Sequence, residues 1–147
     1  MSVKEAVLLE GKLLAAKIQD NIKENISSFA AKGLPQPRLL AMQVSKDPSS
    51  EWYLGQQKKL AEKLGILFNL LPADHFPDQP ALMNRILQAN DDSSVTGVFL
   101  TMPLPKGFDS DQALTNLNPS KDVEAITPPS LGLIVFLPLA MALLKGR

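Results

Sequence analysis

The fold is organised around residues 49–59, Ser-Ser-Glu-Trp-Tyr-Leu-Gly-Gln-Gln-Lys-Lys, which follow a predicted strand and open a predicted helix. This stretch holds the only Trp and the only Tyr of the chain. Asp47 and the serines suit a helix N-cap, because a short side-chain oxygen accepts from the free amides of the first turn. Tyr53 and Gln57 are one turn apart and share a helix face. Such a face suits a flat heteroaromatic ligand; the alternative is a half-buried aromatic cap beside solvated glutamines.

Composition bounds the class of protein. At 147 residues, 45% hydrophobic and 20% charged, the chain has the size and character of one globular domain. Fifteen Lys and Arg balance fifteen Asp and Glu, which argues against nonspecific nucleic-acid binding. The absence of Cys excludes disulfides and thiolate chemistry, and a single His argues against a His-based metal site. Residues 1–6 lack the features of a secretory signal, so we expect a cytoplasmic location.

Strand and helix patterns alternate along the chain. Apolar runs predict strands at residues 6–9, 38–44, 66–71 and 95–101. Helical spacing predicts helices from residue 12 to Gly33, from the Tyr53 stretch to Gly65, and over 81–89. The first helix carries an apolar stripe that we expect to be buried, consisting of Leu14, Ile18, Ile22, Ile26 and Phe29. The alternation predicts an α/β fold, with a parallel sheet of about four strands flanked by helices in three α/β/α layers.

Two loops lie where such a sheet places its ligands, beyond the carboxyl ends of strands. One covers residues 45–50 and leads into Tyr53. The other, residues 101–106, is Thr-Met-Pro-Leu-Pro-Lys, in which two prolines fix φ and remove amide donors. Farther along, Asp122 and Glu124 are two residues apart, and strand alternation would direct both to one side. A plain rigid turn and ordinary solvated acids remain the structural alternatives.

The C-terminal segment is strongly apolar. Residues 131–144 contain no charged residue, yet they are too few for a membrane span, which needs about 20. Pro138 predicts the end of a strand and the start of a helix that runs to Lys145. So apolar a segment must pack on this domain, on a second copy, or on something missing. We therefore expect a domain at residues 1–130 and an apolar segment at 131–147, through which homo-oligomers could form.

Three stretches, in order, carry a family resemblance. Residues 44–53, VSKDPSSEWY, look like the motif V-G-x-x-P-x-S-x-x-Y; residues 97–105, GVFLTMPLP, look like G-x-x-x-Q-x-P-L-P; and residues 119–125, PSKDVEA, look like P-x-K-D-V-D-G. Together they resemble the bifunctional methylenetetrahydrofolate dehydrogenase/methenyltetrahydrofolate cyclohydrolase family. The resemblance runs from about residue 8 to residue 136. It implies the N-terminal, folate-binding domain of that family.

The resemblance also implies a site for a tetrahydrofolate-type small molecule between the tyrosine, the proline loop and the acidic loop. Its expected substrate-binding residues are Ser50, Tyr53, Met102, Pro103, Leu104 and Glu124. In the family a lysine one turn after the tyrosine performs acid-base chemistry, and the glutamine before P-L-P orients it. The corresponding catalytic positions here are Gln57, Thr101 and Asp122.

The sequence departs from the family motifs at the positions that carry the acid-base chemistry. The carboxamide of Gln57 neither gives nor takes a proton at neutral pH, and Lys58 lies about 100° farther around the helix. Ser45 and Ala125 stand where the family has glycine. These changes predict folate binding with weak or no dehydrogenase or cyclohydrolase activity.

No glycine-rich G-x-G-x-x-G opens a helix, so we expect the family's NADP- or NAD-binding Rossmann domain to be missing and no cofactor to be bound by this chain.

Two alternatives to a folate-binding domain with weak or no activity remain open. One is an active enzyme in which Lys58 or water replaces the lysine. The other is a noncatalytic interaction module, or a truncated relic, that self-associates through its apolar tail.

Overall fold

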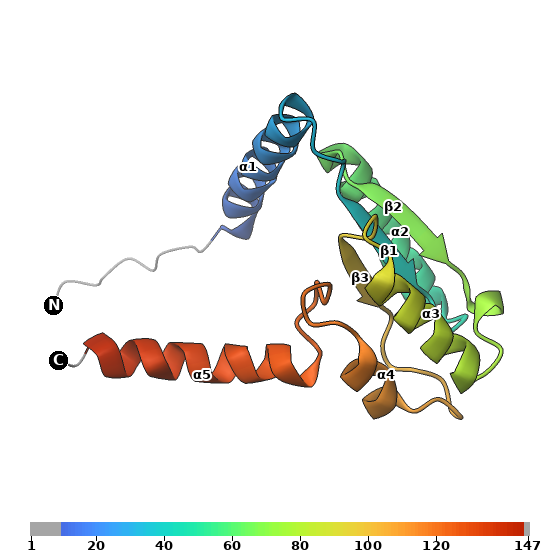
Figure 1. Ribbon diagram of the computed structural model, residues 1–147. Helices are drawn as coiled ribbons and strands as arrows, with labels where there is room; N and C mark the ends of the chain where they lie inside the picture. Colours follow the sequence, from blue (N-terminus) through green and yellow to red (C-terminus); the bar gives the residue numbers. More distant parts are fainter. Residues whose placement is uncertain (1–9, 146–147) are drawn as a thin grey trace, which may run out of the picture.

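The computed structural model describes residues 10–145, in which three parallel strands form the sheet. The strands are β1 (Arg38–Met42), β2 (Leu67–Leu71) and β3 (Gly97–Leu100), in the order β2-β1-β3 (Figure 1). Leu39 of β1 is in register with Phe68 on one side and Gly97 on the other. The predicted parallel α/β fold is confirmed with three strands, and the strand expected at residues 6–9 lies outside the described residues.

Helices cover both faces of the sheet (Figure 1). On one face, α2 (Pro48–Leu64) places Leu54 against Ala41 and Phe99. On the other face lie α3 (Gln79–Asp91) and α4 (Ser110–Asn116), which enclose the larger apolar core. That core includes Met42, Val44, Leu82, Ile86, Val98, Leu100 and Ala113. The predicted three-layer arrangement is therefore confirmed.

Aspartates start the three helices that pack on the sheet. The side chains of Asp47, Asp78 and Asp109 accept hydrogen bonds from amides in the first turns of α2, α3 and α4. Gly65 ends α2 with φ +82, a conformation that favours glycine. The seven residues of α4 are too few to show helical periodicity, so this helix was not expected from the sequence. A short 3₁₀ turn, η1 (Ala73–His75), lies in the predicted loop before α3.

The first helix, α1 (Gly11–Ala31), is present as predicted, but the prediction that its apolar stripe is buried is wrong. No residue of α1 is buried, and Leu14 and Ile18 are 61% and 49% exposed. The helix stands away from the sheet and meets the body at α2 (Figure 1), where Lys63 Nζ donates to Gln19 Oε1 at 2.9 Å. Its periodicity is real, but among the described residues only the C-terminal end of α2 approaches the stripe, so Ile22 and Ile26 are half-buried and the N-terminal half of the stripe stays exposed.

The last helix, α5 (Pro128–Lys145), is continuous, so the strand predicted before Pro138 is wrong. The helix starts at two consecutive prolines, which suit a first turn because its amides need no partner within the helix. Its first backbone bond runs from Leu131 N to Thr127 O at 2.9 Å. α5 projects away from the sheet (Figure 1), and Phe136 is 67% exposed. Among residues 10–145, no helix has the length and apolar character to cross a membrane.

Candidate functional site

A cavity of about 460 Å³ opens where the carboxyl end of β3 meets the N-terminal half of α2 and the loop before α5. Three stretches that are far apart in the sequence line it. They contribute Ser49, Ser50, Trp52 and Tyr53, then Phe99, Thr101 and Met102, and finally Glu124 and Ile126. Five of the nine predicted site residues therefore share one cavity, namely Ser50, Tyr53, Thr101, Met102 and Glu124.

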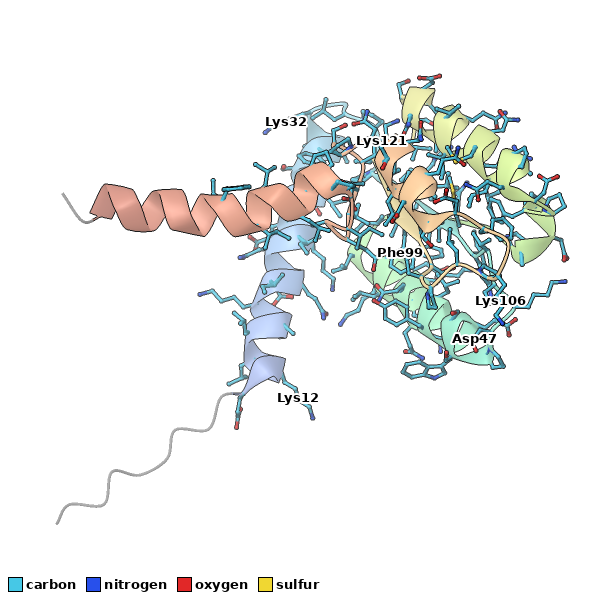
Figure 2. All side chains as sticks on the ribbon, turned by 90° about the horizontal axis from the view of Figure 1, so that it is seen from below. Lys12, Lys32, Asp47, Phe99, Lys106 and Lys121 are labelled. Carbon is cyan, nitrogen blue, oxygen red and sulfur yellow. The ribbon has the colours of Figure 1, made fainter. Side chains whose placement is uncertain are left out.

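The α2 wall is aromatic and polar. The ring of Tyr53 lies 5.8 Å from that of Phe99, centroid to centroid, at an interplanar angle of 38°. Trp52 is 68% exposed at the rim. Figure 2 shows Asp47 at the start of α2 and Phe99 on the sheet side of this helix. Hydrogen bonds from the hydroxyl of Ser49 and the amide of Ser50 lower the pKa of Asp47, so the helix start carries a carboxylate at neutral pH.

Thr101 begins the proline loop with its hydroxyl already paired. The side chain is buried, and Oγ1 donates to Met42 O at 3.2 Å and accepts from Val44 N at 3.3 Å. These bonds join the end of β3 to the end of β1. The Met102–Pro103 peptide is cis, and neither Pro103 nor Leu104 lines the cavity. The side chain of Leu104 packs against the core on the α3 face instead.

The two predicted acids have different roles. Glu124 lines the cavity, where partial burial, and then the charge of Asp122, raise the pKa of its carboxyl. Asp122 does not line the cavity; it accepts from Ile126 N at 3.2 Å and Thr127 N at 2.9 Å. Burial alone would raise the pKa of Asp122, but the hydrogen bonds, foremost that from Thr127 N, lower it overall. Asp122 thus shapes the loop that presents Glu124.

Lys121 anchors this acidic segment, a role that the sequence analysis missed. Its Nζ donates to Ala89 O at 2.7 Å and Asp92 O at 2.8 Å, at the end of α3 (Figure 2 labels Lys121). Its own carbonyl accepts from Val98 N at 2.7 Å, which fixes the segment beside β3. No local sequence signal identifies this contact, because Ala89 and Asp92 lie 32 and 29 residues before Lys121 in the chain.

The glycine-favouring backbone expected at position 125 is present. Ala125 has φ +56 and is the one non-glycine residue with positive φ among those described. Ser45, the other residue that stands in place of a family glycine, does not share this conformation. The exchange at position 125 therefore places a Cβ where the backbone prefers glycine, whereas the exchange at position 45 does not.

Gln57 and Lys58 lie differently around α2. Gln57 is half-buried one turn beyond Tyr53 and does not line the cavity as the structure stands. Lys58 lines a separate crevice of about 280 Å³ with Gln43 and Phe68, and its Nζ lies 4.0 Å from a carboxylate oxygen of Glu62. Lys58 is therefore directed away from the Tyr53 cavity. Over residues 10–145 no group of three His, Asp or Glu side chains is arranged to hold a metal.

Comparison with known proteins gives a consistent result. The family model described as "Tetrahydrofolate dehydrogenase/cyclohydrolase, catalytic domain" matches residues 9–124. The bifunctional protein FolD of Aquifex aeolicus is 36% identical over 132 residues, which cover 88% of this chain and 45% of that protein. The corresponding protein of Agathobacter rectalis is 34% identical, with 88% and 46% covered. The chain thus spans less than half the length of these curated relatives.

Solved structures agree. The bifunctional FolD methylenetetrahydrofolate dehydrogenase/cyclohydrolase of Campylobacter jejuni superposes with a TM-score of 0.77 at 32% identity, covering 86% of this chain and 45% of that one. The 5,10-methylenetetrahydrofolate dehydrogenase of the silkworm Bombyx mori gives 0.81 at 26% identity, with 88% and 44% covered. The Trypanosoma brucei enzyme, complexed with NADP and an inhibitor, gives 0.76 at 25% identity, with 89% and 44% covered.

Proposed function

This chain belongs to the tetrahydrofolate dehydrogenase/cyclohydrolase catalytic-domain family, and from that premise we propose that its cavity binds a tetrahydrofolate-type ligand but supports weak or no cyclohydrolase chemistry. The observation that carries the proposal is the convergence of three family-like motifs on one cavity. Tyr53 and Phe99 offer an aromatic wall for a planar ring system. Glu124 offers a carboxylate that can accept from the adjacent N–H groups of a pterin.

Weak catalysis is proposed because no proton-transfer group replaces the family lysine. Gln57 occupies the position of the family lysine and has no titratable group. Lys58 lies beside Glu62 on the other side of α2. The hydroxyl of Thr101, at the position of the orienting glutamine, is already committed to Met42 O. Loss of a positioned general base typically reduces a rate by about 10²–10⁴-fold.

A fluorescence titration tests binding. Trp52 is the only tryptophan and lines the cavity, so a ligand that enters should change its emission. We expect 5,10-methenyltetrahydrofolate to give a saturable change, weakened in Tyr53→Ala. Lys58→Ala is the matched control, because this side chain lies on the other side of α2 and should leave the titration unchanged. A flat titration up to millimolar ligand refutes the proposal.

A gain-of-function pair tests the chemistry. Gln57→Lys should raise the rate at which 5,10-methenyltetrahydrofolate is hydrolysed. The loss of this compound's absorbance measures that rate. Gln56→Lys adds the same charge one residue earlier, on an exposed position, and should not. A native chain as fast as its curated relatives would show that Gln57 is not limiting.

Hydride transfer is not proposed for this chain alone. No G-x-G-x-x-G loop is present in the sequence, so NADP should not bind to residues 1–147. Isothermal titration calorimetry with NADP tests whether the chain binds this cofactor. Saturable binding there would overturn the expectation.

A second candidate is a noncatalytic module that self-associates through α5. Its support is that Leu133, Ile134 and Phe136 on this helix are 56–67% exposed. Phe136→Lys should then reduce the mass measured by sedimentation while leaving the fold intact. A monomeric native chain would remove this candidate.

A further inference from the structure

The ligand cavity carries charge of one sign only. Among the nine described residues that line it, Glu124 is the only carboxylic acid, and no Lys, Arg or His is present. The pKa of Glu124 is raised first by partial burial and then by Asp122, and no described cation lowers it. The carboxylate of Glu124 therefore meets an entering ligand without a positive partner of its own.

The lysines nearest in sequence to the lining residues do not line the cavity. Lys46 forms an ion pair with Asp74, and Lys121 Nζ donates to two carbonyl oxygens at the end of α3. Lys58 lines the separate crevice beyond α2, and Lys106 is exposed outside the lining. The cavity therefore keeps its negative sign.

The start of α2, which adjoins the cavity, does not reverse that sign. A helix N-terminus carries a partial positive charge that attracts anions. Here the carboxylate of Asp47 already occupies it, accepting from the hydroxyl of Ser49 and the amide of Ser50, two residues that line the cavity. The positive end of α2 is thus offset before any ligand arrives.

Aromatic rings complete the surroundings. Trp52, Tyr53 and Phe99 line the cavity, and the side chains of Trp52 and Tyr53 are accessible from solvent. The face of an aromatic ring attracts a cation through the ring quadrupole, most strongly for Trp. Three rings, one carboxylate and no ammonium group are surroundings that favour a delocalised organic cation.

We propose that the cavity selects its folate by charge and prefers the cationic 5,10-methenyl form to the neutral 5,10-methylene form. This inference rests on the proposed function, because it requires a tetrahydrofolate to enter the cavity. The two forms have the same ring atoms and differ by one hydride. Only the methenyl form carries a positive charge, which is shared between two nitrogens across the bridging carbon. Shape and apolar contact are nearly equal, so charge is left to discriminate.

Paired fluorescence titrations at pH 7 test this selection. Trp52 reports both ligands, and the ratio of their two dissociation constants is the measured quantity. A partly screened carboxylate and an exposed aromatic face together should favour the methenyl form by about tenfold. The ratio should shrink toward one as salt is raised to about 1 M, because screening weakens the attraction. The glutamate tail is common to both ligands, so its own salt dependence cancels.

A matched pair of carboxylate variants locates the charge. Glu124→Gln keeps the length of the side chain but removes its charge, so the ratio should fall severalfold. Glu51→Gln removes the same charge from α2, where Glu51 lines the separate crevice, and should leave the ratio unchanged. Thermal unfolding checks that both variants fold, and the salt series on the native chain tests the same charge without any substitution.

The possible results distinguish charge selection from folate binding itself. Equal affinities, or a tighter methylene form, overturn charge selection and leave folate binding intact. It is also overturned if Glu124→Gln weakens both ligands equally, because the carboxylate then serves only the N–H groups of the pterin. An equal loss of the ratio in Glu51→Gln would assign the effect to the overall charge of α2 and overturn it as well. Binding of neither ligand removes the proposed function, and charge selection with it.

Discussion

Gly97→Ala tests how the acidic segment is held against β3. A Cβ built at Gly97 would collide with Cγ1 of Val123, whereas its next neighbours, Leu39 Cδ1 at 3.5 Å and Lys121 O at 3.8 Å, are ordinary contacts. The strain therefore comes from one side chain. Overpacking of this kind costs about 1–3 kcal/mol. For a chain of this size, each kcal/mol lowers the unfolding temperature by about 2–4 °C.

The companion variant decides whether that reasoning is right. Val123 is 54% exposed, so Val123→Ala alone should change the unfolding free energy by less than about 0.5 kcal/mol. In the Gly97→Ala background it should restore most of the lost stability, giving a favourable coupling energy of about 1 kcal/mol or more. Urea unfolding of the four proteins measures this cycle. The reasoning fails if Gly97→Ala is neutral, or if the double variant is as unstable as Gly97→Ala alone.

Three further predictions concern the same segment and use the same unfolding assay. Ala125→Gly should stabilise by about 0.5–1 kcal/mol, because relief of a left-handed conformation exceeds the added chain entropy; a destabilised variant would contradict this. Asp122→Asn should destabilise by about 1–2 kcal/mol at pH 7, through weaker acceptance from Thr127 N. Because the folded-state pKa of Asp122 is lowered, that difference is fully present above the usual value of about 3.9 and should shrink as pH falls through the lowered value; a constant difference would count against it. Lys121→Met should cost about 1–2 kcal/mol, since Ala89 O loses a charged donor, and Lys121→Arg should recover part of it.

The sheet could be predicted from sequence because each of its signals is local. The buried apolar runs, the helix start at Asp47 and the glycine stop at Gly65 all act within a few residues. The error at α1 arose because burial depends on a distant partner. The stripe of α1 has real periodicity, but periodicity does not reveal whether another element faces it. The apolar run in α5 fits a strand or a helix equally well until the consecutive prolines are recognised as a first turn.

The site could be predicted as a set of positions but not as a set of side-chain directions. A motif fixes where a residue lies along the chain, and the parallel sheet brings the three motifs together. Motif position does not show that Leu104 turns into the core or that Asp122 turns back onto the amide of Thr127. Nor does it show that Lys121 reaches the end of α3, since that contact depends on how the acidic segment packs.

We expect the exchanges at positions 57 and 101 to act together. A longer glutamine at position 101 could extend toward position 57, but Thr101 uses its hydroxyl to join Met42 O and Val44 N at the ends of two strands. A lysine restored at position 57 would therefore lack a glutamine at position 101 to lower its pKa, and we expect it to remain largely protonated at pH 7. We expect Gln57→Lys to recover turnover chiefly at alkaline pH, with the rate still rising above pH 8. Gln57→Lys combined with Thr101→Gln should move that rise toward neutrality, at some cost in stability from the broken strand link. A Gln57→Lys profile already flat at pH 7 would show that something other than residue 101 sets the pKa of the lysine.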